Sequence, residues 1–247
     1  MTRSVTTDYV ADFQSDLEDI DKLESTPDLI RGVAIDSLDR AIATVGVPNT
    51  VKQALKNSKL SIENIKQESI ADNFKTIYVQ MCILAVSSLE TTLKRYFVNT
   101  LKQPENINSD SKRLQEIKLS LKDIVDHELK FGGKVGQIIL DKASLNFQDL
   151  QAIKRNFKEF SDKDIRLDKK TEENICFYLE SRHILVHKGG VIDKKFIDAT
   201  GSFGANIKQY KVGDKIELDS SDWSNIKDSF TGLVEGATKR RGKSQNF

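Results

Sequence analysis

Apolar residues recur every three or four positions along most of the chain, which is the spacing of amphipathic α-helices. The first stretch with this spacing covers 9–24, and a second ends at Ile42. Because proline has no backbone N–H to donate inside a helix, we expect Pro27 to separate two helices. A third helix is predicted near 50–57, after the break at Pro48.

The longest stretch with helical spacing, residues 68–101, predicts a central helix. Its middle, from Ile77 to Val86, is apolar on every side, and a helix that is apolar all round must be covered by other elements. This apolar run is too short to cross a bilayer and contains Gln80. No apolar signal-like segment stands near the N-terminus. We therefore expect a cytoplasmic protein without membrane association.

Further helices are predicted at 110–130, 146–160 and 170–187, and a last one begins around Trp223. The region between the last two is richer in glycine, valine and isoleucine, and its pattern predicts a short β-hairpin near 207–218. The expected fold class is therefore all-α, a helical bundle with extra N-terminal helices and one small hairpin.

Composition excludes several classes of protein. A chain of 247 residues with 38% hydrophobic content can bury a core without disulfides or a structural metal. Two cysteines, Cys82 and Cys176, are too few for a disulfide scaffold or a cysteine-rich zinc module. Both lie in apolar surroundings, and we expect them to be small buried hydrophobic residues.

The net charge of +1 conceals an uneven distribution. Residues 1–50 carry ten acidic and four basic side chains, so the rest of the chain is basic. The acidic excess is either a solvated helix face or an arm that covers a basic surface. The basic tail from Lys239 through Arg240 and Arg241 is either a solvated chain end or a segment that follows an RNA backbone.

Two of the three histidines lie close together at the end of a predicted helix. His183 and His187 are four residues apart and share a helix face. Arg182 and His187 are five apart, which corresponds to about 140° around an ideal helix. They converge on one ligand only if the helix end is distorted or a second copy contributes. Otherwise they form a structural helix-end pair, with Arg182 bonded to Glu180 or another carboxylate.

Arginine and histidine without nearby acidic or cysteine partners suit phosphodiester cleavage in RNA. This reaction needs a general base, a general acid and positive charge on the phosphate, and imidazole and guanidinium groups supply these without a metal. Lys188 adds positive charge at the same helix end. By contrast, His127 is expected on the exposed surface, and the glycines at 132–136 lack Walker spacing and predict a turn.

Three features together carry a family resemblance. Arg182 is followed by the polar His183 and, five residues on, by His187; residues 187–193 read His-x-x-Gly-x-Ile-Asp; and a Ser-x-x-Glu element occupies 87–90. Over roughly residues 70–235 the chain resembles the HEPN superfamily, whose ribonuclease members carry an Arg-x(4–6)-His motif. The resemblance implies a helical bundle that homodimerises through its motif helices and forms a composite active site between the subunits.

The resemblance further implies a metal-independent endoribonuclease that leaves a 2′,3′-cyclic phosphate and needs no cofactor. Arg182, His187 and His183 would be catalytic, and Glu90 would support them. Such proteins act as toxins or antiphage defence effectors, with RNA as the substrate and an antitoxin or another protein as a regulator. A catalytically inactive helical module that dimerises and binds RNA or a protein partner is the alternative.

The expected division of the chain has three parts. They are an acidic N-terminal helical segment at 1–66, a HEPN-like helical domain at 67–236, and the basic tail at 237–247.

Overall fold

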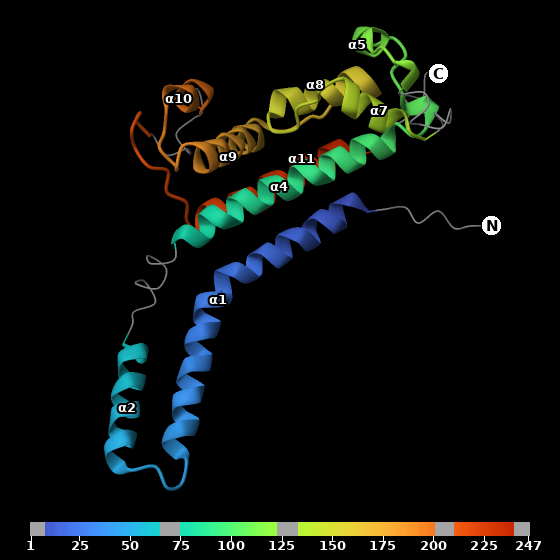
Figure 1. Ribbon diagram of the computed structural model, residues 1–247. Coiled ribbons are helices and arrows are strands. Elements are labelled where there is room, and N and C mark those ends of the chain that lie inside the picture. The colour runs from blue at the N-terminus through green and yellow to red at the C-terminus, as the bar shows by residue number, and fades with distance from the viewer. Residues whose placement is uncertain (1–7, 65–74, 123–132, 201–209, 240–247) are drawn as a thin grey trace, which may run out of the picture.

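The computed structural model describes residues 8–64, 75–122, 133–200 and 210–239, and these form an α-helical protein (Figure 1). The all-α prediction is confirmed. In chain order the helices are α1 (Tyr9–Ala43), α2 (Asn49–Glu63), α4 (Lys75–Thr100), the short 3-10 helix η1 (Pro104–Asn106), α5 (Lys112–Glu116), α7 (Val135–Lys142), α8 (Leu150–Ser161), α9 (Lys169–His187), α10 (Lys194–Thr200) and α11 (Ser220–Thr238).

Helices α4 and α11 form the middle layer of the body (Figure 1). The first half of α1 packs on one side of this layer, and α8 and α9 lie on the other. α4 contacts α1, α7, α9 and α11, so the prediction of a central helix is confirmed for its described part. α4 is also long and apolar enough to cross a membrane by length and composition. Its buried side chains pack against other helices of the body.

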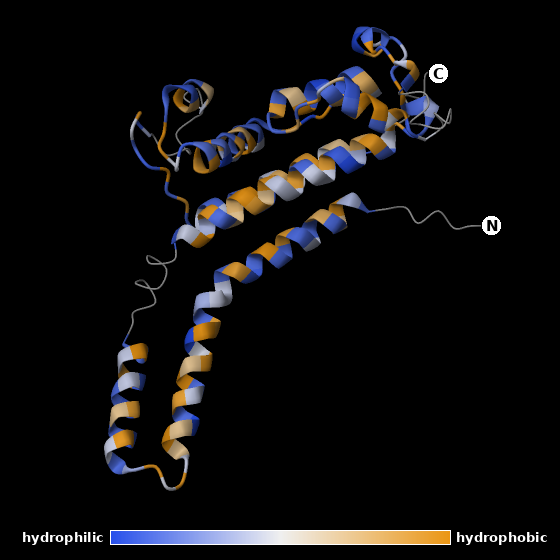
Figure 2. Ribbon diagram, in the orientation of Figure 1, coloured by the Kyte–Doolittle hydropathy of each residue, from blue (hydrophilic) through white to orange (hydrophobic). Residues whose placement is uncertain are grey.

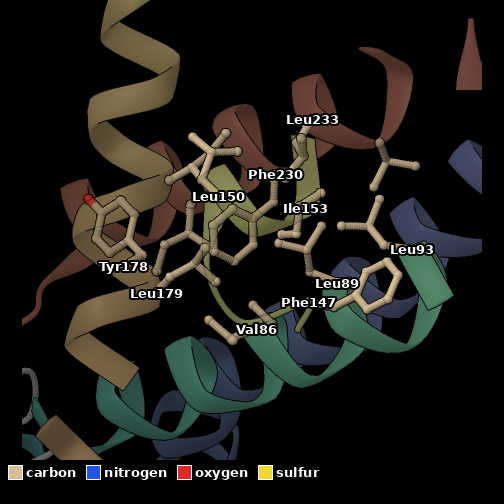
Figure 3. Packing of buried hydrophobic residues seen from close by; sticks show 14 of the residues in the cluster. Val86, Leu89, Leu93, Phe147, Leu150, Ile153, Tyr178, Leu179, Phe230 and Leu233 are labelled. Carbon is tan, nitrogen blue, oxygen red and sulfur yellow. The ribbon is translucent and has the colours of Figure 1, made fainter. Parts of the chain in front are cut away.

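The core is one continuous cluster that draws on all three layers. Figure 3 shows side chains of α4, α8, α9 and α11 meeting in its centre. Toward the C-terminal end of α4, Phe97 makes edge-to-face contacts with Phe147, Phe157 and Phe160, with ring centroids 5.5–6.0 Å apart. Edge-to-face pairs of this kind stabilise by about 0.5–1.5 kcal/mol beyond simple burial.

The acidic N-terminal half of α1 belongs to this body. Phe13, Leu17 and Ile20 of α1 are buried in the common core. On the same helix, Asp21 accepts hydrogen bonds from Trp223 Nε1 at 2.5 Å and from Lys227 Nζ at 2.9 Å. The hydrogen bond from the Trp223 side chain, aided by Lys227, lowers the pKa of Asp21 despite partial burial. Asp21, one of the acidic residues at the front of the chain, therefore helps to dock α1 on α11.

One helix replaces the two that Pro27 was expected to separate. α1 is helical from Tyr9 to Ala43 with Pro27 inside it. The hydroxyls of Ser25 and Thr26 both donate to the carbonyl of Lys22, and Pro27 lacks the N–H that would bond the preceding turn. These features bend the helix rather than end it, and Figure 1 shows α1 turning away from the body near this point.

Beyond the bend, α1 pairs with α2 as a projecting helical hairpin (Figure 1). Arg31 of α1 donates to the carbonyls of Ile62 and Glu63 at the end of α2, at 3.4 and 2.9 Å. Lys59 of α2 bonds Asp39 of α1 at 2.7 Å. α2 itself contains no buried residue. Polar contacts and half-buried apolar residues therefore hold the hairpin together.

Two predicted elements are corrected. The helix expected at 110–130 is interrupted: it is helical at Lys112–Glu116, not helical at 117–120 and helical again at 121–122, while 123–132 lies outside the described residues. Within the glycine segment expected to form a turn, residues from Val135 on begin α7. α7 was missed because its glycine, Gly136, normally disfavours helix. Here the absence of a side chain lets the helix lie directly on the backbone of α4.

The expected hairpin at 207–218 is also replaced. Residues 207–209 lie outside the described part, and Lys211–Asp214 form a turn. The one β-bridge among the described residues joins Lys215 to Val191, in the segment that follows α9. The segment with β-like composition therefore pairs with the residues that follow α9, which are distant from it in sequence. The cysteine prediction holds better: Cys82 is fully buried and Cys176 half-buried, and burial raises their pKa values to about 12 and about 11.

Two glycine-to-alanine substitutions should have opposite effects on stability. A Cβ at Gly136 would lie 2.5 Å from the carbonyl oxygen of Val98, whereas one at Gly32, inside α1, meets nothing within 4 Å. We expect Gly136→Ala to destabilise by about 1–3 kcal/mol through overpacking. Gly32→Ala should stabilise the helix by up to about 1 kcal/mol. Urea unfolding of both variants measures this, and equal effects would contradict the close packing of α7 on α4.

Candidate functional site

The motif residues lie at the C-terminal end of α9. The helix begins at an N-cap, Asp168, whose side chain accepts from the N–H of Thr171. It ends at His187, as the sequence predicted, and Gly189 and Gly190 follow with φ of +61° and +78°. Only glycine adopts this left-handed conformation without strain. The N–H of Gly190 donates to the carbonyl of Ile184 at 3.0 Å, which closes the helix end.

The chain beyond α9 is held by the bridge between Val191 and Lys215. The N–H of Ile216 donates to the carbonyl of Gly190, and that of Ile192 to the carbonyl of Asp214, both at 2.9 Å. These hydrogen bonds fix the segment that follows α9 relative to the end of the helix. They also bring the strand-like segment containing Lys215 beside that end.

The two histidines face each other, as their spacing predicted. The ring centroids of His183 and His187 are 5.0 Å apart and the rings are tilted by 52°. His187 is exposed and His183 half-buried. Val186, between them in sequence, and Lys188, after them, are exposed as well. The end of α9 therefore presents two imidazoles to solvent at neighbouring positions.

Arg182 is directed differently from the histidines. Its side chain is half-buried, and its Nε atom is buried with no hydrogen-bond partner among the described residues. The charge of Arg182 acts on Glu90 of α4. Of the two forms of the structural alternative, a bond to Glu180 is not found in the described part, whereas the interaction with Glu90 is compatible with a pair to another carboxylate. A buried donor without a partner costs about 1–3 kcal/mol, so the Nε of Arg182 is held at an energetic cost.

Glu90 is the centre of a small polar cluster beneath Arg182. It accepts hydrogen bonds from Lys94 Nζ at 2.5 Å and from Gln148 Nε2 at 3.0 Å. Burial opposes ionisation of Glu90, but the bonds from Lys94 and Gln148 and the charges of Lys94 and Arg182 outweigh it, and the pKa of Glu90 is lowered. Glu90 is thus a carboxylate held ionised next to the motif arginine.

The basic tail lies elsewhere on the molecule. α9 and α11 run antiparallel: Tyr178 bonds Asp222, near the start of α11, whereas Gly236, near its end, lies against Ile165 and Leu167, which precede α9. Lys239, which follows α11, is therefore at the opposite end of α9 from His187 within one protomer (Figure 1). Arg240 and Arg241 lie outside the described residues, as does His127.

A cavity of about 570 Å³ is also separate from the motif. It lies between α1 and α11 and is lined by Glu18, Asp21, Lys227 and Glu235, among others, and by none of the motif residues. An open surface at the end of α9, rather than a closed pocket, is the candidate site. In the described part of the chain, no group of three or more histidine, cysteine or acidic residues is placed to hold a metal ion.

Sequence reasoning missed three residues near the motif. Lys94 stands four residues after Glu90, and this helical pair spacing could have revealed it. Gln148 and Lys215 come from segments distant in sequence, and neither has a local signal. The predicted link between Glu90 and the motif arginine is supported by the electrostatics.

Comparisons with protein-family models, with curated proteins and with solved structures each find no match.

Removing the charge of Glu90 should change the pH dependence of stability. The lowered pKa means that Glu90 stabilises the fold above its unfolded pKa of about 4.3. This contribution is lost as the pH falls through the native pKa. We expect Glu90→Gln to destabilise by about 1 kcal/mol at pH 7, a value discounted for partial exposure. The difference from the parent should shrink as the pH falls through this range.

Urea unfolding across a pH series measures this difference, with Glu105→Gln, at an exposed site in η1, as the control. A destabilisation by Glu90→Gln that stays constant down to pH 3 would show that charge is not the reason.

Proposed function

We propose that this protein is a metal-independent endoribonuclease of the type that its resemblance to HEPN proteins implies. One observation supports the proposal above the others. His183 and His187 present two neighbouring imidazoles at the exposed end of α9, on the same helix as an arginine whose Nε has no partner in the described part. These groups are the minimum for acid–base cleavage of RNA.

The reaction uses the 2′-hydroxyl of the RNA as the nucleophile. A neutral imidazole takes the proton from this hydroxyl as its oxygen bonds the adjacent phosphorus. The bond from phosphorus to the 5′-oxygen breaks, and a protonated imidazole gives that oxygen a proton. The products are a 2′,3′-cyclic phosphate and a free 5′-hydroxyl. His187, the exposed ring, is assigned to one proton transfer, and His183 or the second copy's histidine to the other.

Arg182 is assigned to the phosphate. Its guanidinium offers donors in a fixed fork, which matches the oxygens of the pentavalent transition state. Glu90 is the positioning residue, because it is ionised and its negative charge orients the guanidinium from below. The neighbouring bonds from Lys94 and Gln148 fix Glu90 in turn.

A second copy of the chain completes the site in this proposal. Arg182 and His187 differ by about 140° around α9, and Arg182 acts toward Glu90 while His187 faces solvent. Val186 on α9 and Leu84 on α4 are large apolar residues, each more than two-fifths exposed. Pairing of these surfaces about a twofold axis would cover both side chains. It would also bring the arginine of one copy toward the histidine of the other.

Positive charge around the end of α9 supports RNA as the substrate. The helix C-terminus carries a partial negative charge, which favours a protonated imidazole but repels phosphate. Lys188 and Lys215, both exposed, offset this repulsion. The tail residues Lys239, Arg240 and Arg241 contact RNA only along a longer strand or from the partner copy. A role as a toxin or antiphage effector, regulated by an antitoxin, belongs to the same proposal.

The proposal is tested by incubating the purified protein with total RNA in EDTA. We expect cleavage that leaves cyclic phosphate ends, and a loss of at least about 100-fold in rate for His187→Ala and for Arg182→Ala. The matched control is His127→Ala, which removes the histidine outside the motif. Circular dichroism and thermal unfolding confirm that each variant is folded.

Three outcomes would overturn this function. They are an absence of cleavage by the parent protein, cleavage that requires a divalent metal, and full activity in either motif variant. RNA binding without turnover would instead favour the alternative, an inactive helical module that dimerises and binds.

A further inference from the structure

The projecting hairpin, defined as residues 28–43 of α1 together with α2, is short of buried surface. None of its residues is classed as buried. Leu29, Ile30 and Val33 of α1 are 67%, 62% and 57% exposed, and Val51 and Leu60 of α2 are about half exposed. Figure 2 shows hydrophobic positions along both helices of the hairpin. Leu29 and Ile30 each lie one helical turn from Val33, so these three exposed side chains are neighbours on α1.

The contacts within the hairpin leave much of its apolar surface uncovered. Units below about 40 residues usually need a disulfide, a metal or association with another chain. The cysteines of the chain, Cys82 and Cys176, both lie in the body. α2 packs against α1, and the polar contacts of Arg31 and Lys59 stabilise the pair by only a small amount. Association with another chain would bury the apolar side chains that these contacts leave exposed.

The charges of the hairpin identify its partner. The α1 half, residues 28–43, has three acidic and two basic side chains, and α2 has three lysines and one glutamate. The acidic α1 half is thus attracted to the basic α2, and the bond between Lys59 and Asp39 is an example within one hairpin. A second hairpin turned antiparallel about a twofold axis sets α1 of one copy against α2 of the other. The surface is therefore complementary to itself.

We propose that two copies of this chain associate through their hairpins to form an antiparallel four-helix bundle. Four helices in this arrangement enclose a core that two cannot, and they cover the apolar side chains of both helices. The bend at Pro27 holds the hairpin away from the body, so the association leaves the end of α9 accessible. The inference is independent of the proposed function, and RNA cleavage is not among its readouts.

Analytical ultracentrifugation of the full chain tests this association. The parent protein should be a dimer or a larger even assembly, and Ile30→Glu with Val33→Glu should halve its mass. Both residues are already exposed, so the variant should fold, and circular dichroism and thermal unfolding verify this. The control is Val212→Glu, at a residue that is 62% exposed in a turn of the body, which should leave the mass unchanged.

A charge exchange provides the second test. Lys52→Glu with Lys56→Glu makes α2 acidic, and we expect it to halve the mass by placing like charges opposite one another. Adding Asp28→Lys and Asp36→Lys to the same chain should restore the original mass.

A monomeric parent protein would overturn the proposal. So would a folded hairpin variant with the mass of the parent, which would assign any association to the body. Failure of the charge exchange to restore the mass would refute the pairing of α1 with α2.

Discussion

α4 buries apolar side chains on several sides. Each surrounding helix covers a different strip of the α4 surface, and this contact determines the position of that helix. α1, α7, α9 and α11 all contact α4. Each fully buried leucine or phenylalanine contributes about 1.5–3 kcal/mol relative to exposure. Since Leu89, Leu93 and Phe97 are all buried, α4 cannot be uncovered without a loss comparable to the whole stability of a small domain.

The polar residues of α4 mark the borders between these strips. Ser88 donates to Asp16 of α1 on one side, while Glu90, two residues on, faces Gln148 and the charge of Arg182 on another. The packing of the helices around the core therefore also brings the ionised carboxylate of Glu90 close to α9, the helix that carries the motif. In this way the electrostatics of the candidate site follow from the hydrophobic arrangement and need no separate scaffold.

α1 takes part in two different environments because Pro27 bends it. Before the bend, Phe13 and Leu17 enter the common core, and Asp21 ties the helix to Trp223 of α11. After the bend, the helix has only α2 for a neighbour in the described part and keeps its apolar residues exposed. The same helix thus stabilises the body with its first half and exposes apolar side chains on its second half. This division falls within the segment 1–66 rather than at its end.

Local sequence signals were sufficient to predict those elements whose structure depends mainly on their own residues. The helical spacing predicted α4, α8, α9 and α11, and the pair Gly189 and Gly190 predicted the end of α9 at His187. The shared face of His183 and His187 also follows from spacing alone. The predictions failed where residue propensity and packing disagree. Pro27 bends α1 but does not end it. Gly136 lies in the first turn of α7, where the close backbone of α4 leaves no room for a side chain.

The sequence by itself therefore determined the helical fold class, the central helix and the composition of the motif at the end of α9. The tertiary structure decided which distant segments meet. It placed Gln148 on Glu90, brought the charge of Arg182 near that carboxylate, and separated Lys239 from His187 through the antiparallel course of α9 and α11. The reason is physical. Helix periodicity is fixed by neighbours three and four residues apart, whereas contacts between helices depend on how all the apolar faces are covered at once.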